Sequence, residues 1–288
     1  MTDREVFSFQ GIGTTWNITT AHPLPQSLRT RLVQRVERFD AGWSRFRPDS
    51  LVAELARTPG SYSFPEEAGP LGGLYRRLYL LTLGAMTPLV GGSLERLGYD
   101  AGYSLRVAGP PLPAPAWESV LAWAGTSITA SAPVVLDIGA AGKGLLADLL
   151  AEELEAAGIG TFVIDASGDL LVRGPESVRV ALEHPGNPDQ AIGIVELEGR
   201  ALCASAINRR AWGDGLHHVL DGTTGRPAQT AVATWAMAET AMVADALATA
   251  LFFVPGSTLQ ESFDFSWLTV FPDGSAAYSA DFEGTLFP

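Results

Sequence analysis

Residues 134–158 constrain the fold more than any other stretch, because three local patterns follow one another there (VVLDIGAAGKGLLADLLAEELEAAG). The apolar residues 134–136 predict a short buried strand, and a glycine-spaced turn follows over residues 139–144. Leucines then recur at helical spacing until Gly158, a residue typical of a helix end. Glycines let the backbone approach an anion, and the unpaired N–H groups and dipole of a helix N-terminus favour negative charge. The stretch therefore predicts a strand, a phosphate-binding turn and a helix.

Lys143 lies inside this turn and is the only lysine in the sequence. A chain that otherwise uses arginine for its cationic side chains keeps one lysine at the place suited to an anion, which favours a role in binding. The alternative is an ordinary strand-to-helix turn with a solvated lysine, because the turn matches neither a GxGxxG segment nor a P-loop.

The net charge of the 288-residue chain is −13. This charge argues against nucleic acids and anionic membranes as partners, because no basic stripe is present to displace counterions. Cys203 is the only cysteine, so a disulfide framework and a cysteine-based zinc site are excluded. Residues 1–10 lack the features of a signal peptide, and the longest apolar run, 244–254, is too short for a membrane span. These features predict a cytoplasmic protein.

Helical and strand patterns are mixed along the chain without regular alternation. Amphipathic or apolar helices are predicted at 28–39, 74–83 and 241–254. Strand patterns are predicted at 6–20, 160–174, 178–182, 192–197, 201–205, 232–237 and 267–278, and residues 183–190 are expected to form a solvent loop. Because strict strand–helix–strand repeats are missing, the sequence favours an α+β fold over a doubly wound sheet.

Asp245 and Thr249 lie four residues apart on one face of an otherwise apolar helix. A carboxylate there is costly unless it is paired or bound to a cation. With backbone carbonyls and phosphate oxygens, this carboxylate and hydroxyl form a hard-oxygen set suited to Mg²⁺. The alternative is that Asp245 caps its helix and Thr249 bonds back to the backbone.

Two histidines, His217 and His218, precede a turn-rich segment. A histidine with an ordinary pKa is suited to act as a general base near neutral pH. A pair of surface histidines explains the sequence equally well. The turn at Asp169 is expected to be structural, because an aspartate between two strands usually serves the turn itself.

A series of motifs in a fixed order resembles the ApbE family, the FAD:protein FMN transferases. The resemblance extends over most of the chain. The motifs are GIGTTW at 11–16, WSRFRPDS at 43–50, GAMTPLV at 84–90, DIGAAGKG at 137–144, ASGDL at 166–170, HHVLDGTTGRPA at 217–228 and ADALATALF at 244–252.

The resemblance implies a T-fold-related α+β fold, with mixed sheets and packed helices in one compact domain over residues 1–288. It implies that a Ser or Thr hydroxyl of a partner flavoprotein attacks FAD, so that FMN becomes esterified to that protein and AMP leaves. The implied acceptor segment is Asp-Gly-x-(Ser/Thr)-(Gly/Ser/Ala)-(Ser/Thr). Mg²⁺ would be held by Asp245, Thr249 and the carbonyl of Ala140, and His218 would deprotonate the acceptor. The implied FAD-contacting positions are Ile12, Phe46, Ala85, Met86, Thr87, Asp137, Lys143 and Val219.

The chain departs from the family pattern at three places. Met86-Thr87 replaces Phe-Asp, so a carboxylate is missing; Ala204-Ser205-Ala206 replaces Thr-Ser-Gly; and Gly222 stands where the family has proline. Two alternatives therefore remain beside the transferase. One is a non-catalytic FAD-binding or carrier protein, and the other is an FAD pyrophosphatase in which water replaces the acceptor hydroxyl.

Overall fold

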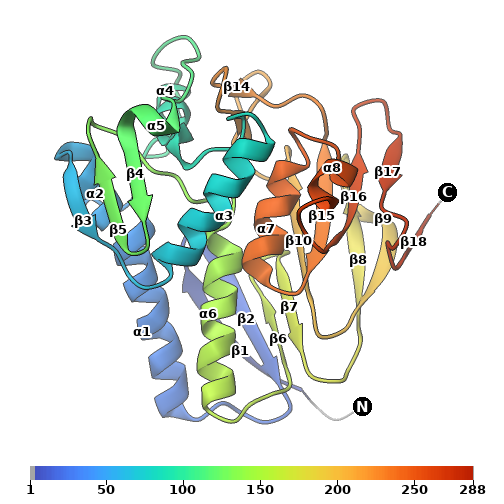
Figure 1. Ribbon diagram of the computed structural model, residues 1–288. Coiled ribbons are helices and arrows are strands. Elements are labelled where there is room, and N and C mark those ends of the chain that lie inside the picture. The colour runs from blue at the N-terminus through green and yellow to red at the C-terminus, as the bar shows by residue number, and fades with distance from the viewer. Residues whose placement is uncertain (1–3, 288) are drawn as a thin grey trace.

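The computed structural model describes residues 4–287 and is built around an eight-stranded antiparallel sheet (Figure 1). Strands consecutive in the chain pair where turns are short, as in the hairpin of β1 and β2. Helices or strands of the smaller sheets separate the other neighbouring pairs in the sequence. In spatial order the strands are β1 (Glu5–Gly11), β2 (Thr14–Thr20), β6 (Phe162–Asp165), β7 (Leu170–Arg173), β10 (Ala201–Ala206), β15 (Ala233–Ala238), β16 (Ser266–Val270) and β17 (Ala276–Tyr278).

Smaller sheets lie around this central sheet. One contains β3 (Gly60–Ser63), β5 (Ser127–Ala130) and β4 (Leu121–Ala124), and another contains β18 (Gly284–Leu286), β9 (Asn187–Leu197) and β8 (Val178–His184). Two-residue strands form two further pairs, β11 (Ala211–Trp212) with β12 (Leu216–His217) and β13 (Leu220–Asp221) with β14 (Arg226–Pro227).

Three helices cover one face of the central sheet: α1 (Gln26–Trp43), α6 (Gly142–Ala156) and α7 (Ala241–Ala250) (Figure 1). α7 is apolar around most of its surface because it packs against α6 on one side and against β10 and β15 on the other. The remaining helices are α2 (Leu51–Arg57), α3 (Ala68–Leu81), the 3₁₀ helix η1 (Pro88–Val90), α4 (Gly91–Arg96), α5 (Trp117–Val120) and α8 (Gly256–Gln260).

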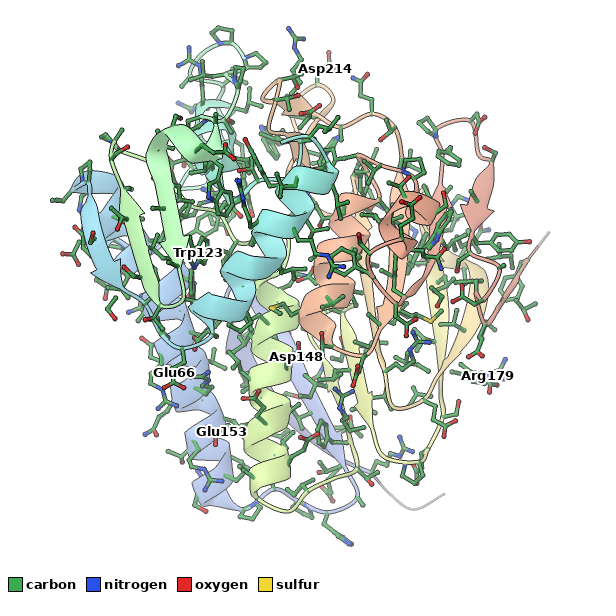
Figure 2. All side chains as sticks on the ribbon, viewed as in Figure 1. Glu66, Trp123, Asp148, Glu153, Arg179 and Asp214 are labelled. Carbon is green, nitrogen blue, oxygen red and sulfur yellow. The ribbon has the colours of Figure 1, made fainter. Side chains whose placement is uncertain are left out.

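The junction of α6 and α7 is held by polar contacts as well as by apolar packing. Asp148 of α6, labelled in Figure 2, accepts hydrogen bonds from the backbone N–H groups of Ala241 and Met242 at 2.8 Å. Near the N-terminus of α6, the N–H of Gly144 donates to a carboxylate oxygen of Asp245 at 3.0 Å. These bonds use N–H groups that the helix ends leave free, and they bring the start of α6 against α7.

The α+β class is confirmed, and so are the helices predicted at 28–39, 74–83 and 241–254. The strand predicted at 134–136 is wrong: these residues join no sheet formed by residues 4–287, and the next residue, Asp137, donates its N–H to the carbonyl of Pro88. The solvent loop predicted at 183–190 is also wrong, because most of it belongs to the ends of β8 and β9, which form a hairpin with irregular pairing there.

No helix among residues 4–287 combines the length and apolar character that a membrane crossing requires. The single domain and the cytoplasmic location stay predictions.

Gly144→Ala is expected to lower the melting temperature by roughly 3–10 °C, the equivalent of about 1–3 kcal/mol of overpacking. A Cβ at this position would lie 2.0 Å from the carbonyl oxygen of Ala241, which is backbone and cannot rotate away. Gly73→Ala is the matched control, since Gly73 is exposed within α3 and has no atom within 4 Å of a Cβ. Thermal unfolding should show Gly73→Ala unchanged or slightly stabilised, because alanine favours the helix. Equal melting temperatures for Gly144→Ala and the wild type would contradict the close approach of α6 and α7.

Candidate functional site

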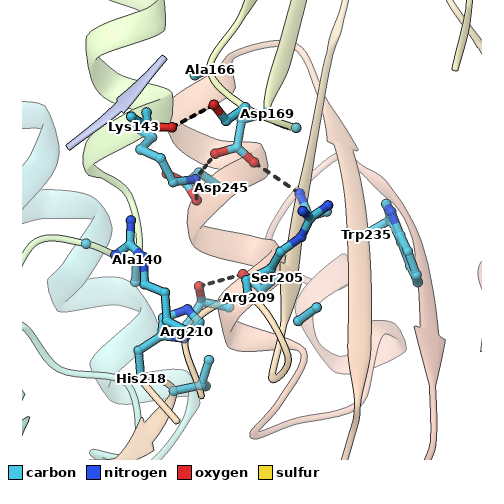
Figure 3. A pocket seen from close by; sticks show the side chains of 18 of the residues that line it. Ala140, Lys143, Ala166, Asp169, Ser205, Arg209, Arg210, His218, Trp235 and Asp245 are labelled. Carbon is cyan, nitrogen blue, oxygen red and sulfur yellow. Dashed lines mark hydrogen bonds and ion pairs between the residues drawn. The ribbon is translucent and has the colours of Figure 1, made fainter. Parts of the chain in front are cut away.

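Two adjoining cavities open beside the N-terminus of α6. The larger has a volume of about 520 Å³ and is lined by the β6–β7 turn, β10, α7 and the segment that carries His218 (Figure 3). The smaller has a volume of about 330 Å³ and is lined by the end of α1 and the segment after it. Asp137, Lys143 and Arg210 line both cavities, so the two spaces meet at charged side chains.

The fold gathers most of the predicted site residues at these cavities, although they come from distant parts of the sequence. Ile12 and Phe46 line the smaller cavity. Ala85 lines a separate cavity of about 560 Å³, so the structure does not bring it to the other residues. The roles assigned to these residues stay predictions. The larger cavity is lined by Met86, Thr87, Asp137, Ala140, Lys143, His218, Val219, Asp245 and Thr249.

Lys143 extends from the first turn of α6 to two buried carboxylates. Its ammonium forms an ion pair with Asp169 and lies 3.7 Å from an oxygen of Asp245 (Figure 3). The side chains of Asp169 and Asp245 are only 2% and 3% exposed. Two carboxylates therefore share one ammonium, which leaves a net negative charge in a place with little water. Such a site favours the binding of a further cation.

Asp245 and Thr249, the predicted magnesium ligands, line the same cavity. Asp245 does not cap α7, because Thr240 occupies the cap and accepts the hydrogen bond from the N–H of Val243. The hydroxyl of Thr249 lies 3.2 Å from that of Ser205 on β10, within the same cavity. The chemistry of this donor set fits Mg²⁺, since carboxylate, hydroxyl and carbonyl oxygens are the ligands that the ion prefers.

No group of three histidine, cysteine, aspartate or glutamate side chains among the described residues is arranged to hold a metal ion. A magnesium ion at Asp245 would therefore depend on the Thr249 hydroxyl, the Ala140 carbonyl and the oxygens of a bound substrate or of water.

Asp137 is held by Arg45 at the junction of the two cavities. Burial alone would raise the pKa of Asp137, but the Arg45 guanidinium, 2.6 Å away, brings that pKa below its ordinary value. The second oxygen of Asp137 accepts a hydrogen bond from the N–H of Gly139 at 2.7 Å. Asp137 therefore stays ionised and orders the glycine-rich turn that leads into α6.

The two histidines lie in different surroundings. His217 is buried, and its Nε2 donates to the carbonyl of Ala228 at 3.0 Å. His218 lines the larger cavity and its buried Nδ1 has no hydrogen-bond partner in the part of the chain that the structure describes. Burial, followed by the positive charge of Arg210, lowers the pKa of His218 from 6.5 to about 3. The expectation of an ordinary histidine pKa was therefore wrong, and His218 is neutral near pH 7.

Two of the departures from the family pattern lie in contact. Thr87 is buried, and its hydroxyl accepts a hydrogen bond from the N–H of Leu89 at 3.2 Å. A Cβ at Gly222 would lie 2.5 Å from the methyl group of Thr87. The Thr87 methyl therefore occupies space that a side chain at position 222 would need.

Asp169 was missed as a site residue because a Ser-Gly-Asp turn between two strands looks structural. Ser167 adopts a left-handed conformation with φ of 58°, and the carbonyl of Asp169 accepts the N–H of Ala166. This turn directs the Asp169 carboxylate inward, where it also accepts the N–H of Ala204 at 3.2 Å. The motif at 166–170 was the available signal, but the residues alone assign it no role.

Lys143→Met is expected to destabilise the protein by about 3 kcal/mol, because removing one partner of a buried ion pair leaves uncompensated charge. The value lies at the low end of the usual range since the Lys143 side chain is 24% exposed. The melting temperature should fall by roughly 6–12 °C and should recover in part with added Mg²⁺.

Arg209→Met is the control for the loss of an exposed ion pair. Arg209 pairs with Glu183 at 2.8 Å, but 56% of its side chain is exposed. The expected loss is below about 1 kcal/mol. If Lys143→Met and Arg209→Met both have the melting temperature of the wild type, Lys143 does not compensate the charge of the two carboxylates.

A family model described as the ApbE family matches residues 12–264. The chain is 31% identical over 230 residues to the FAD:protein FMN transferase of Rhodobacter capsulatus. These aligned residues cover 73% of the chain and 43% of the relative. It is 30% identical over 161 residues to that of Escherichia coli, covering 53% of the chain and 44% of the relative. The chain thus spans less than half the length of these two relatives. The fold is similar to that of the ApbE protein of Thermotoga maritima, with a TM-score of 0.81, 22% identity and coverage of 98% and 99% of the two chains. By the extent of the family match, the chain belongs to the ApbE family.

Proposed function

We propose that the chain is a magnesium-dependent FAD:protein FMN transferase, the activity for which its curated relatives are named. In this reaction a Ser or Thr hydroxyl of an acceptor flavoprotein loses its proton to His218. The hydroxyl oxygen bonds to the FMN-side phosphorus of FAD. The bond from that phosphorus to the bridging oxygen breaks, and AMP leaves with its electron pair.

One observation carries the proposal: His218, Asp245 and Thr249 line one cavity beside the start of α6. The pKa of His218, about 3, keeps its imidazole neutral at physiological pH, and the negative charge of a bound FAD diphosphate would raise that pKa toward the range in which a base accepts a proton well. Asp245, Thr249 and the Ala140 carbonyl would hold Mg²⁺, which would neutralise charge on the FAD diphosphate. Lys143 contacts both carboxylates beside this site and holds them in place.

The test is an incubation with FAD and Mg²⁺ in the presence and absence of a flavoprotein domain that carries the implied acceptor segment. AMP and a covalently flavinylated acceptor should form only when all components are present. Omission of Mg²⁺, or replacement of the acceptor Ser or Thr by alanine, should stop both products.

Two other results would replace the proposal. AMP release without the acceptor would make the chain an FAD pyrophosphatase. Tight FAD binding without AMP in any mixture would make it a non-catalytic flavin-binding protein, the alternative that Thr87 favours because it stands where the family has a carboxylate.

A further inference from the structure

The basic side chains that line the two cavities differ in whether a carboxylate compensates them. Arg45, Arg47, Lys143 and Arg209 each lie within 4.0 Å of an Asp or Glu oxygen. Arg210 also lines both cavities, but no carboxylate of residues 4–287 lies within that distance of it. The chain carries a net charge of −13, and Arg210 is the one arginine or lysine lining these cavities that forms no ion pair with a carboxylate of residues 4–287.

Arg210 stands where the two cavities meet. It belongs to the short segment between β10 and β11. The one side-chain hydrogen bond that it forms within residues 4–287 runs from Nη1 to the Tyr99 hydroxyl at 3.1 Å. Arg210 lines the larger cavity together with His218 and Asp137, and its positive charge contributes to the lowered pKa values of both. Figure 3 shows the Arg210 side chain on the same side of the pocket as His218 and Ala140.

We propose that Arg210 binds the diphosphate of FAD, an inference that rests on the proposed function. FAD carries its diphosphate between two ring systems, and the two cavities offer one space on each side of Arg210. A guanidinium donates paired N–H groups to phosphate oxygens, a geometry that an ammonium does not reproduce. Lys143 is less suited to this task because two carboxylates already hold it.

The same position gives Arg210 a part in the transfer step. When the acceptor oxygen bonds to phosphorus and the bridging bond breaks, the departing AMP phosphate gains the electron pair and hence negative charge. The acceptor proton goes to His218. A guanidinium that stays on the diphosphate through this step stabilises the added charge. Arg210 is thus proposed to contact the substrate directly.

The experiment compares FAD binding to the wild type, Arg210→Ala and Arg210→Lys by fluorescence titration at several NaCl concentrations. Arg210→Ala should weaken FAD binding by about tenfold to a hundredfold, the range for a charge-assisted hydrogen bond. Its affinity should also depend less on salt than that of the wild type, because one exposed charge contact is gone. Arg210→Lys should recover only part of the affinity.

Two control variants test whether the effect of Arg210→Ala on FAD binding comes only from the lower net charge of the protein or only from the lost contact with Tyr99. Arg179→Ala removes the same charge from a solvent-facing arginine on β8 that lines neither of the two cavities, and this variant should bind FAD as the wild type does. Tyr99→Phe removes the hydrogen bond between the Arg210 side chain and the Tyr99 hydroxyl. FAD binding by this variant should depend on salt as it does in the wild type. A changed salt dependence would mean that Arg210 acts by holding Tyr99.

The outcomes distinguish this inference from the proposed function. If Arg210→Ala binds FAD with wild-type affinity and salt dependence while the wild type transfers FMN, the inference is wrong and the proposed function stands. If Tyr99→Phe reproduces both effects of Arg210→Ala, Arg210 is structural and the inference is again wrong. If the wild type does not bind FAD, the proposed function and the inference both fail.

Discussion

His218→Ala is expected to lower the rate of AMP release by roughly 10²–10⁴-fold, the usual contribution of a general base. The affinities for FAD and Mg²⁺ should change little, because the predicted metal ligands lie on α7 and on the turn before α6. Single-turnover release of AMP, measured with saturating FAD and acceptor, separates this loss of chemistry from a loss of binding.

His217→Ala is the matched control, since the two histidines are adjacent and only His218 lines the cavity. The variant removes the hydrogen bond to the Ala228 carbonyl and should lower the melting temperature. The rate per folded molecule should stay within a fewfold of the wild type. If His217→Ala removes the chemistry and His218→Ala does not, the base has been assigned to the wrong histidine.

The lowered pKa of His218 also predicts how kcat/KM and the stability of the protein depend on pH. The plot of kcat/KM against pH, which reports the free enzyme, should show no rising limb near pH 6.5, because the imidazole loses its proton near pH 3. Between pH 3 and pH 6.5, His218 binds fewer protons in the folded state than in the unfolded state. Stability should therefore fall as the pH drops from 6.5 toward 3. Urea unfolding at pH 7 and pH 4.5 should show a smaller loss for His218→Ala than for the wild type.

Local patterns predicted the parts of the fold in which burial follows sequence spacing. The helical spacing of leucines predicted the position of α6, and the apolar run from residue 241 predicted where α7 begins. Both predictions succeeded because these helices bury their apolar residues against the rest of the core. The pair Asp245 and Thr249 was found for the same reason, since four residues make about one turn and place polar groups on one side.

The errors arose where distant segments decide the structure. Val134 and Leu136 are buried as predicted, yet residues 134–136 form no strand because no strand within residues 4–287 pairs with them to complete a ladder. The inward direction of Asp169 depends on the N–H of Ala204 and on Lys143, both remote in the sequence. Nothing in an Arg-Arg pair shows that Arg209 meets Glu183 while Arg210 meets no carboxylate among the described residues.

Asp245→Asn is expected to abolish the Mg²⁺ response and to lower transfer by at least roughly 10²–10³-fold, as for the loss of one electrostatic contact in a transition state. Asparagine keeps an oxygen able to accept the N–H of Gly144, which preserves the contact between α6 and α7. It also removes one of the two carboxylates that share Lys143. The metal-free variant should therefore be at least as stable as the wild type, whereas an alanine would leave the Gly144 N–H unpaired.

A thermal unfolding series in increasing Mg²⁺ measures this prediction without relying on activity. The wild-type melting temperature should rise with Mg²⁺, because a ligand that binds only the folded state stabilises it, and that of Asp245→Asn should stay constant. Asp148→Asn serves as the control, since Asp148 also lies between α6 and α7 but bonds to the N–H groups of Ala241 and Met242. That variant should lose stability and keep the Mg²⁺ response. If Asp245→Asn responds to Mg²⁺ as the wild type does, the ion binds elsewhere, and the two carboxylates around Lys143 need no metal to explain their burial.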